Sequence, residues 1–121
     1  MVLFDTNMVL RYLLNDNEQM AERAEQYLQK GNVFVTIEVI AEAVYVLKGV
    51  YSMKRAAIVN TIREFLSLVQ CREMDVLYLA LEAYGESNLD FVDCVLYGYH
   101  RARGVEIATF DKTLLKLMAE R

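Results

Sequence analysis

Four short strand candidates, separated by longer helical patterns, constrain the fold of this chain more than any other feature. The strand candidates are residues 2–4, 33–35, 69–73 and 106–109. The stretches between them are long enough for helices that cross from one parallel strand to the next. Such crossovers are right-handed and place helices on both faces of the sheet. The sequence therefore predicts an α/β fold, a three-layer α/β/α sandwich around a parallel sheet of about four strands.

The helical segments are marked by apolar residues at helical spacing and by residues that favour helix ends. We expect helices at residues 7–14, 18–29, 37–48, 53–67, 76–86, 90–103 and 112–120. Thr36, Ser52 and Asp75 precede three of these segments and are suited to act as N-caps. Gly104 follows another segment, at a position where glycine readily adopts a left-handed backbone.

The composition is that of a folded protein with one core. The chain has 121 residues, of which 55% are hydrophobic and 25% charged, so it is too apolar to be disordered. We predict a single domain over residues 1–121. No uncharged apolar run approaches the roughly 18 residues of a membrane span, and the N-terminus lacks the pattern of a signal peptide. We therefore expect a cytoplasmic protein with no membrane partner.

The net charge of −4 bears on the choice of partner. If the acidic residues are spread evenly, this charge disfavours a polyanion such as RNA. If five of the 17 acidic residues surround a cation, the 13 basic residues outnumber the remaining acids. The charge balance therefore leaves open a nucleic-acid surface beside an acidic metal site.

Acidic residues follow two of the strand candidates, because Asp5 ends the first and Asp111 comes after the fourth. Open parallel sheets bind ligands beyond the carboxyl ends of their strands, so neighbouring strands would bring both side chains to one edge. An N-cap explains Asp111 equally well. Asp5 ends a buried strand and needs a cap, a partner or a cation.

Two pairs of helical acids are candidates to join them. Glu38 and Glu42 are four residues apart on one helical face, and Asp90 and Asp93 are three apart at the start of another helix. The helix dipole alone explains an acid at Asp90, at the start of a helix. A position on the solvated helix surface alone explains an acid at Glu38. Clustered carboxylates raise one another's pKa unless a cation holds them ionised. Ligation by oxygen alone suits Mg²⁺ or Mn²⁺.

Four strings occur in order along the chain: VLFDTN at the start, IAEAVYVL around position 42, LDFVDCVL around position 93 and ATFD near the end. Over its whole length the chain resembles the PIN-domain ribonucleases, and within them the small VapC-like toxins. The resemblance places the acidic quartet of that family on Asp5, Glu42, Asp93 and Asp111. Asn7, Asp90 and Thr109 match supporting polar positions. Cys94 departs from the pattern, since a small alanine is common there, which affects local packing more than chemistry.

The function that the resemblance implies is hydrolysis of RNA phosphodiester bonds with Mg²⁺ or Mn²⁺. Asp5, Asp93 and Asp111 would hold the cation, which would activate a bound water. Glu42 would complete the shell through water or assist proton removal. The substrate would be single-stranded or looped RNA, because the chain has no groove-reading motif. The protein would be an endoribonuclease toxin of a type II toxin–antitoxin pair, with an antitoxin protein as partner.

Basic and aromatic residues predict two further surfaces. The candidates for phosphate contacts are Arg11, Lys48, Arg55, Arg101, Arg103 and Lys112. A solvated charged surface explains any one of them as well. The apolar excess of a small domain predicts an exposed interaction patch, for which the candidates are Tyr45, Tyr51, Tyr78 and Tyr84. Because PIN-domain toxins commonly form two-fold dimers, we expect a homodimer.

Two other functions are alternatives. An aspartate-dependent phosphotransferase would use Asp5 as its nucleophile, but haloacid-dehalogenase-like proteins require a second aspartate where this chain has Asn7. A non-catalytic PIN-like module that binds RNA or protein is the other alternative, and the presence of all four acids argues against it. His100 is the single histidine and is expected to be structural or on the surface.

Overall fold

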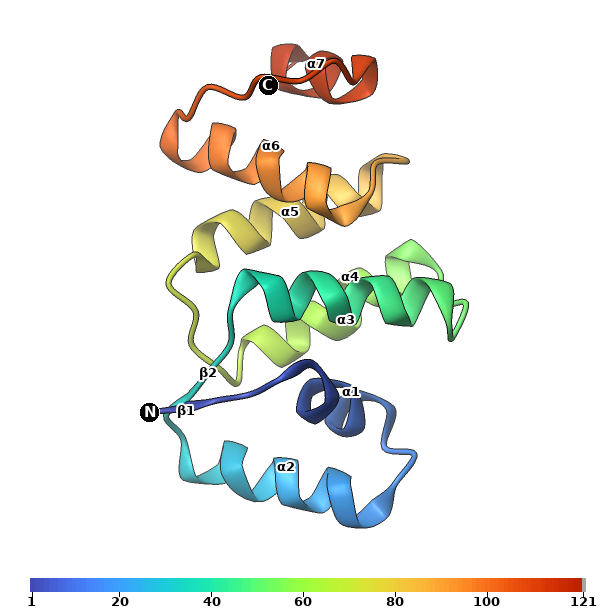
Figure 1. The fold of residues 1–121 in the computed structure, drawn as a ribbon, viewed down its shortest axis with the longest axis vertical. Helices are drawn as coiled ribbons and strands as arrows, with labels where there is room; N and C mark the ends of the chain where they lie inside the picture. The colour runs from blue at the N-terminus through green and yellow to red at the C-terminus, as the bar shows by residue number, and fades with distance from the viewer. Residues whose placement is uncertain (121) are drawn as a thin grey trace. The chain divides into compact units, whose positions relative to one another are not determined.

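The computed structural model describes residues 1–120. Its contacts divide the chain into two compact units, an N-terminal unit over Met1–Arg72 and a C-terminal unit that starts at Glu73. Figure 1 shows the elements of both units in chain order, from blue to red. Among residues 1–120, no helix combines the length and the hydrophobicity needed to span a bilayer. The prediction of a single domain over residues 1–121 stays a prediction.

Two parallel strands form the sheet of the N-terminal unit. Strand β1 (Val2–Leu3) pairs with β2 (Val33–Phe34), and the two lie side by side in Figure 1. The third strand candidate is reduced to one bridge at Gln70, whose amide donates to the Val33 carbonyl at 2.9 Å. The first two strands and the parallel direction of the sheet were therefore predicted correctly.

Four helices accompany this sheet: α1 (Thr6–Leu14), α2 (Glu18–Lys30), α3 (Ile37–Gly49) and α4 (Arg55–Leu66). Thr36 is the N-cap of α3, because its Oγ1 accepts from the Val39 amide at 3.3 Å. The predicted cap at Ser52 is wrong: α4 begins at Arg55, and Ser52 has a left-handed backbone with φ of 54°. An N-cap needs an extended backbone, which a residue in the left-handed region does not have.

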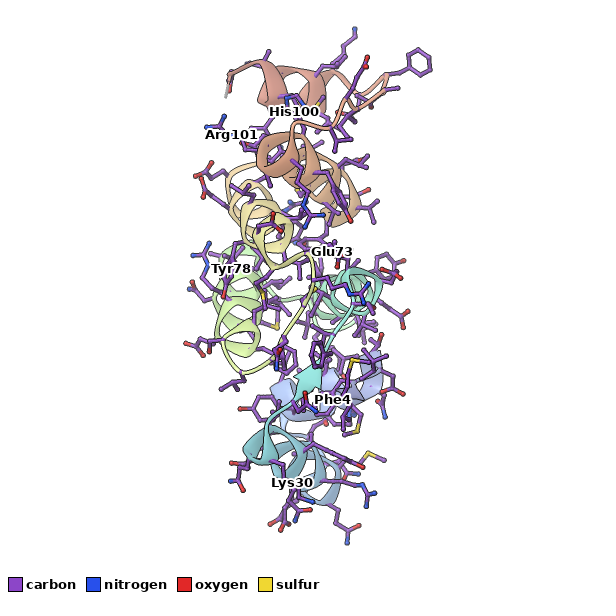
Figure 2. All side chains as sticks on the ribbon, turned by 90° about the vertical axis from the view of Figure 1, so that its left-hand side faces the viewer. Phe4, Lys30, Glu73, Tyr78, His100 and Arg101 are labelled. Carbon is purple, nitrogen blue, oxygen red and sulfur yellow. The ribbon has the colours of Figure 1, made fainter. Side chains whose placement is uncertain are left out.

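The core of the N-terminal unit lies between its sheet and its helices. Its largest fully buried side chains come from α3, α4 and the residue that follows β1, and include Phe4, Ile40, Leu47, Ile58, Ile62 and Phe65. The Phe4 ring, labelled in Figure 2, meets the Tyr27 ring of α2 edge-on, with centroids 6.1 Å apart. The buried Phe4 directly follows β1 and anchors the end of this strand. Asp5, the next residue, is therefore held close to the strand end.

The C-terminal unit consists of three helices: α5 (Met74–Glu86), α6 (Phe91–Arg103) and α7 (Lys112–Glu120). Helices α5 and α6 approach closely at Gly98. A Cβ atom added there would lie 2.6 Å from the Val76 carbonyl oxygen, so only glycine fits this approach. This contact positions the helix that carries Asp93.

Two predictions at helix ends of this unit have opposite outcomes. Gly104 adopts the expected left-handed backbone (φ 66°, ψ 23°), and its amide donates to the His100 carbonyl at 3.0 Å. The N-cap predicted at Asp75 is wrong, because α5 begins at Met74, two residues before the predicted start, and its N-cap position is Glu73. The Asp75 carboxylate instead accepts from Arg103, at 3.0 Å from Nη2 and 3.3 Å from Nε.

The fourth strand candidate has no strand in the structure. Residues 104–111 carry neither helix nor strand, and the described residues form a two-stranded sheet rather than a sheet of about four strands. The four-stranded, three-layer arrangement is therefore not confirmed. A short segment becomes a strand only through a ladder with a neighbour, and Thr109 and Asp111 instead form a side-chain-capped turn that begins α7.

The tyrosines predicted to lie on an interaction surface differ in exposure. Tyr45 is 77% exposed and Tyr51 is 42% exposed at the end of α3, and Tyr78 is 37% exposed on α5. Tyr84 is 3% exposed and packs edge-on against Phe91, so it was wrongly predicted as a surface residue. The prediction for Tyr84 was wrong because the number of aromatic residues in the sequence does not show which face of α5 is buried.

Candidate functional site

Asp5 lies at the junction of β1 and α1. Its backbone is extended (φ −84°, ψ 175°), and its Oδ1 accepts from the Met8 amide at 2.8 Å, which makes it the N-cap of α1. One carboxylate oxygen is thereby held in a fixed direction while the side chain stays exposed. Asn7 lies in the first turn of the same helix and is also exposed.

Glu42 occupies the middle of α3. This helix buries Ile40, Ala43 and Val44, and Glu42 is exposed. Glu38 lies one turn earlier on the same helix and is exposed as well. The two glutamates thus have similar surroundings, which makes them a matched pair for mutagenesis.

Asp90 and Asp93 stand at the start of α6. Asp90 is the N-cap residue by position, but its side chain makes no capping hydrogen bond. Asp93 lies in the first turn and is half-buried. Cys94 is fully buried and its Sγ lies 3.9 Å from the Leu89 carbonyl, which agrees with the prediction that this departure concerns packing.

Asp111 begins α7 in the same way as Asp5 begins α1. Its Oδ1 accepts from the Leu114 amide at 2.8 Å, and its own amide donates to Thr109 Oγ1 at 3.0 Å. The N-cap alternative for Asp111 is therefore correct as a description of its geometry. A cap uses one carboxylate oxygen, so the second oxygen of Asp111 can serve another role.

Three acids of the candidate site, Asp90, Asp93 and Asp111, interact electrostatically. Partial burial raises the pKa of the Asp93 carboxyl, and the negative charges of Asp111 and Asp90 raise it further. Ionised Asp93 is therefore destabilised by its neighbours. A cation between these carboxylates would remove this repulsion.

The site residues belong to both units. Asp90, Asp93, Thr109 and Asp111 lie in the C-terminal unit, and Asp5, Asn7 and Glu42 lie in the N-terminal unit. Within residues 1–120, no three His, Cys, Asp or Glu side chains lie close enough together to hold a metal ion. The convergence of the four predicted acids on one site stays a prediction.

The donor chemistry of these residues nevertheless fits a hard divalent cation. All the candidate ligands are carboxylates, and oxygen ligands suit Mg²⁺ or Mn²⁺. The mutual repulsion of Asp93, Asp111 and Asp90 is the electrostatic condition that a bound cation relieves.

Five of the six basic candidates for phosphate contacts divide into two groups, and the sixth, Arg55, is half-buried. Two are held by carboxylates: Arg11 Nη1 lies 3.0 Å from Asp16, and Arg103 pairs with Asp75. Lys48, Lys112 and Arg101 are exposed, and Arg101 is visible near the end of α6 in Figure 2. The exposed group is the better set of phosphate-binding candidates, because its side chains are accessible to a ligand.

Sequence reasoning missed one residue of the C-terminal unit. Phe110 stands between Thr109 and Asp111 and is 102% exposed, as accessible as a side chain in an extended peptide. The string ATFD contained the signal, because it places an aromatic ring directly before an acid.

The N-terminal unit also has a hollow of about 660 Å³ between α1, α2 and α4. Tyr12, Glu25, Glu64 and Leu68 are among its lining residues, and none of the predicted site residues lines it. Two carboxylates at its wall disfavour a phosphate group. The candidate site therefore rests on the acids and not on this hollow.

Comparison with known proteins identifies the family. The sequence model of the PIN domain family matches residues 2–119 of this chain, a range that includes parts of both units. Neither the curated proteins nor the solved structures that were compared contain a match to this sequence. PIN domains have an α/β fold and are generally nucleases that need a divalent metal ion. The acids at the starts of α1, α6 and α7 and the match over nearly the whole length lead to one conclusion: the chain belongs to the PIN domain family.

Proposed function

We propose that this protein is a Mg²⁺- or Mn²⁺-dependent endoribonuclease that hydrolyses phosphodiester bonds of single-stranded or looped RNA. The observation that supports this proposal most directly is the raised pKa of Asp93, caused in part by Asp111 and Asp90. Carboxylates that repel one another at the starts of two helices are the arrangement that a cation stabilises. In a family of nucleases, that cation serves the hydrolysis of a phosphodiester.

In this proposal Asp5, Asp93 and Asp111 hold the cation. When bound, a divalent cation lowers the pKa of a coordinated water and offsets the charge of the phosphate oxygens. The caps of α1 and α7 fix one oxygen each of Asp5 and Asp111, so the second oxygen of each is oriented before any ligand arrives. Glu42 accepts a proton from the attacking water.

The supporting residues act on these acids. Thr109 orients Asp111 through the hydrogen bond to its amide. Asp90 adds negative charge near Asp93, which strengthens the attraction of the site for a cation. Asn7 supplies an exposed amide close in sequence to Asp5, suited to a water or a phosphate oxygen.

We further propose that the protein is the VapC-like toxin of a type II toxin–antitoxin pair in the cytoplasm. The four sequence strings in register support this role. Tyr45 in the second half of α3 and Val50 and Tyr51 just after the helix are each exposed, which supports a homodimer or a contact with an antitoxin protein.

Purified protein and a set of charge-removing variants test the activity. Asp5→Asn and Asp111→Asn are suitable because asparagine caps helices as well as aspartate does, so the fold is kept while the charge is lost. Each variant should lower the rate of RNA cleavage by several orders of magnitude. Glu42→Gln should also lower the rate, whereas its matched control Glu38→Gln should not.

The metal and the biological role need separate measurements. A chelator should stop cleavage by the parent, and Mn²⁺ or Mg²⁺ should restore it. Equal rates for the parent and Asp5→Asn, or full activity in chelator, would contradict the mechanism. Growth arrest on expression, relieved by the product of a small adjacent gene, tests the toxin role, and light scattering during size exclusion tests the homodimer.

A further inference from the structure

Phe110 is an aromatic side chain without a packing role in the described structure. Its ring is 102% exposed, and it stands between two residues of the proposed site, Thr109 and Asp111. Along this segment Ile107 and Thr109 are half-buried, while Ala108 and Phe110 are exposed. The ring therefore lies on the outer side of a segment whose other side faces the C-terminal unit.

The ordinary structural reason for an apolar residue at this position does not apply. Phe110 directly precedes the N-cap of α7, where an apolar side chain often packs on the fourth residue of the helix. That residue is Leu115, which is 46% exposed, and the full exposure of Phe110 excludes a contact between the two. The ring is therefore available to a ligand.

An exposed lysine two residues from the ring, Lys112, can contact a phosphate and favours a nucleic acid over a protein. Phe110 is followed at once by Asp111 and Lys112, both exposed. The centres of protein–protein interfaces are poor in charged residues, whereas single-stranded nucleic acids bind to aromatic rings that stand among basic side chains. Asp111, which directly follows Phe110, raises the pKa of Asp93 through its charge, so the ring adjoins one of the proposed site acids along the chain.

We propose that Phe110 stacks on one base of a single-stranded RNA and thereby positions the neighbouring phosphodiester at the acids. The inference rests on the proposed nuclease function and names a binding residue for it. Every base has a π-face, so the ring contributes affinity with little sequence preference. Lys112 contacts a phosphate of the same strand.

The test compares Phe110→Ala, Phe110→Leu and Phe110→Tyr with the parent. The probe is a short single-stranded RNA that carries 2-aminopurine at each position in turn, bound in the presence of Ca²⁺ so that affinity is measured without cleavage. The alanine and leucine variants should bind about 5- to 150-fold more weakly and lose the quenching of one 2-aminopurine. In cleavage with Mn²⁺, their KM should rise by a similar factor with kcat nearly unchanged, and Phe110→Tyr should match the parent.

The controls separate this inference from other roles of the ring. Leu115→Ala removes a second exposed apolar side chain of the same unit and should leave RNA affinity unchanged. Parent-like affinity in Phe110→Leu or Phe110→Ala would overturn the stacking role. A large loss of thermal stability in Phe110→Ala would also overturn it, because it would show that the ring is packed. A change in the molecular mass of Phe110→Ala without a change in RNA affinity would overturn it as well, because it would show a protein interface. A parent that neither binds nor cleaves RNA would instead overturn the proposed function itself.

Discussion

Replacing Gly98 with alanine tests how closely α5 and α6 are packed. The added Cβ would lie 2.6 Å from the Val76 carbonyl oxygen and 3.0 Å from Val76 Cγ1. Ordinary contacts begin at 3.4 Å, so the two helices must separate by several tenths of an ångström. The carbonyl belongs to the backbone of α5 and cannot move aside as the end of a flexible side chain can.

The magnitude follows from two opposing effects. Overpacking of a well-packed contact costs about 1–3 kcal/mol, and a clash with backbone belongs near the upper end. Alanine in place of glycine within a helix recovers about 1 kcal/mol. We therefore expect the free energy of unfolding to fall by about 2 kcal/mol, which lowers Tm by about 8 °C in a chain of this size.

Gly49→Ala is the matched control, because Gly49 also lies in a helix but a Cβ atom there would meet nothing within 4 Å. This variant should gain about 0.5 kcal/mol and melt about 2 °C higher. Both variants are measured by thermal and urea unfolding. A Tm for Gly98→Ala at or above that of Gly49→Ala would refute the packing argument.

The same pair of variants links packing to function. Helix α6 carries Asp93 in its first turn, and Gly98 lies five residues further along that helix. A displacement of α6 away from α5 would move Asp93 relative to α5, the helix against which α6 packs. Below both melting temperatures, RNA cleavage by Gly98→Ala should therefore be slower than by the parent, while Gly49→Ala should retain the parent rate.

The pKa of Asp93 is raised in the folded chain, so in the presence of chelator the stability of the parent should fall as pH rises from the ordinary value of 3.8 through the raised pKa. In calorimetry, Asp93→Asn should therefore melt higher than the parent at pH 7 and at the same temperature as the parent in acid. Arg103 lowers the pKa of Asp75, mainly through their hydrogen bond, so this pair contributes stability above pH 3.8 that is lost as pH falls through the lowered pKa. Arg103→Met should return that pKa toward 3.8 in a carboxyl NMR titration; an unchanged pKa would contradict the pairing. Ser52 has a φ of 54°, so Ser52→Gly should raise Tm by about 4 °C in thermal unfolding. Saturating Mn²⁺ should raise the Tm of the parent by more than that of Asp93→Asn, and equal gains would argue against Asp93 as a ligand.

The helices were predictable from sequence because their causes are local. The stripe that includes Ile40 and Val44 and the cap at Thr36 both lie within one segment, and Gly104 ends α6 through its own backbone conformation. Asp75 shows where local reasoning stops. It has the chemistry of a cap, but it pairs with Arg103, which is 28 residues away in sequence. A single sequence does not reveal which of two suitable partners an acid takes.

The sheet and the site were less predictable because both depend on distant segments. Residues 106–109 have a strand-like composition, yet a strand also needs a ladder partner, which composition does not specify. The charge of Asp111 contributes to the raised pKa of Asp93, and the predicted grouping of the acids in one site is not tested by this effect. The grouping with Asp5 and Glu42 stays a prediction, because those residues belong to the other compact unit.

The caps formed by Asp5 and Asp111 also bear on how such a chain changes over generations. Each residue satisfies a helix amide through one oxygen, and the amide oxygen of asparagine does this equally well. One base change in either codon would thus abolish the negative charge without exposing the chain to misfolding or degradation. Selection for folding alone does not distinguish the two amino acids at these positions. Under the proposed function, inactive descendants of this protein can therefore arise in a single step and persist as intact folded chains.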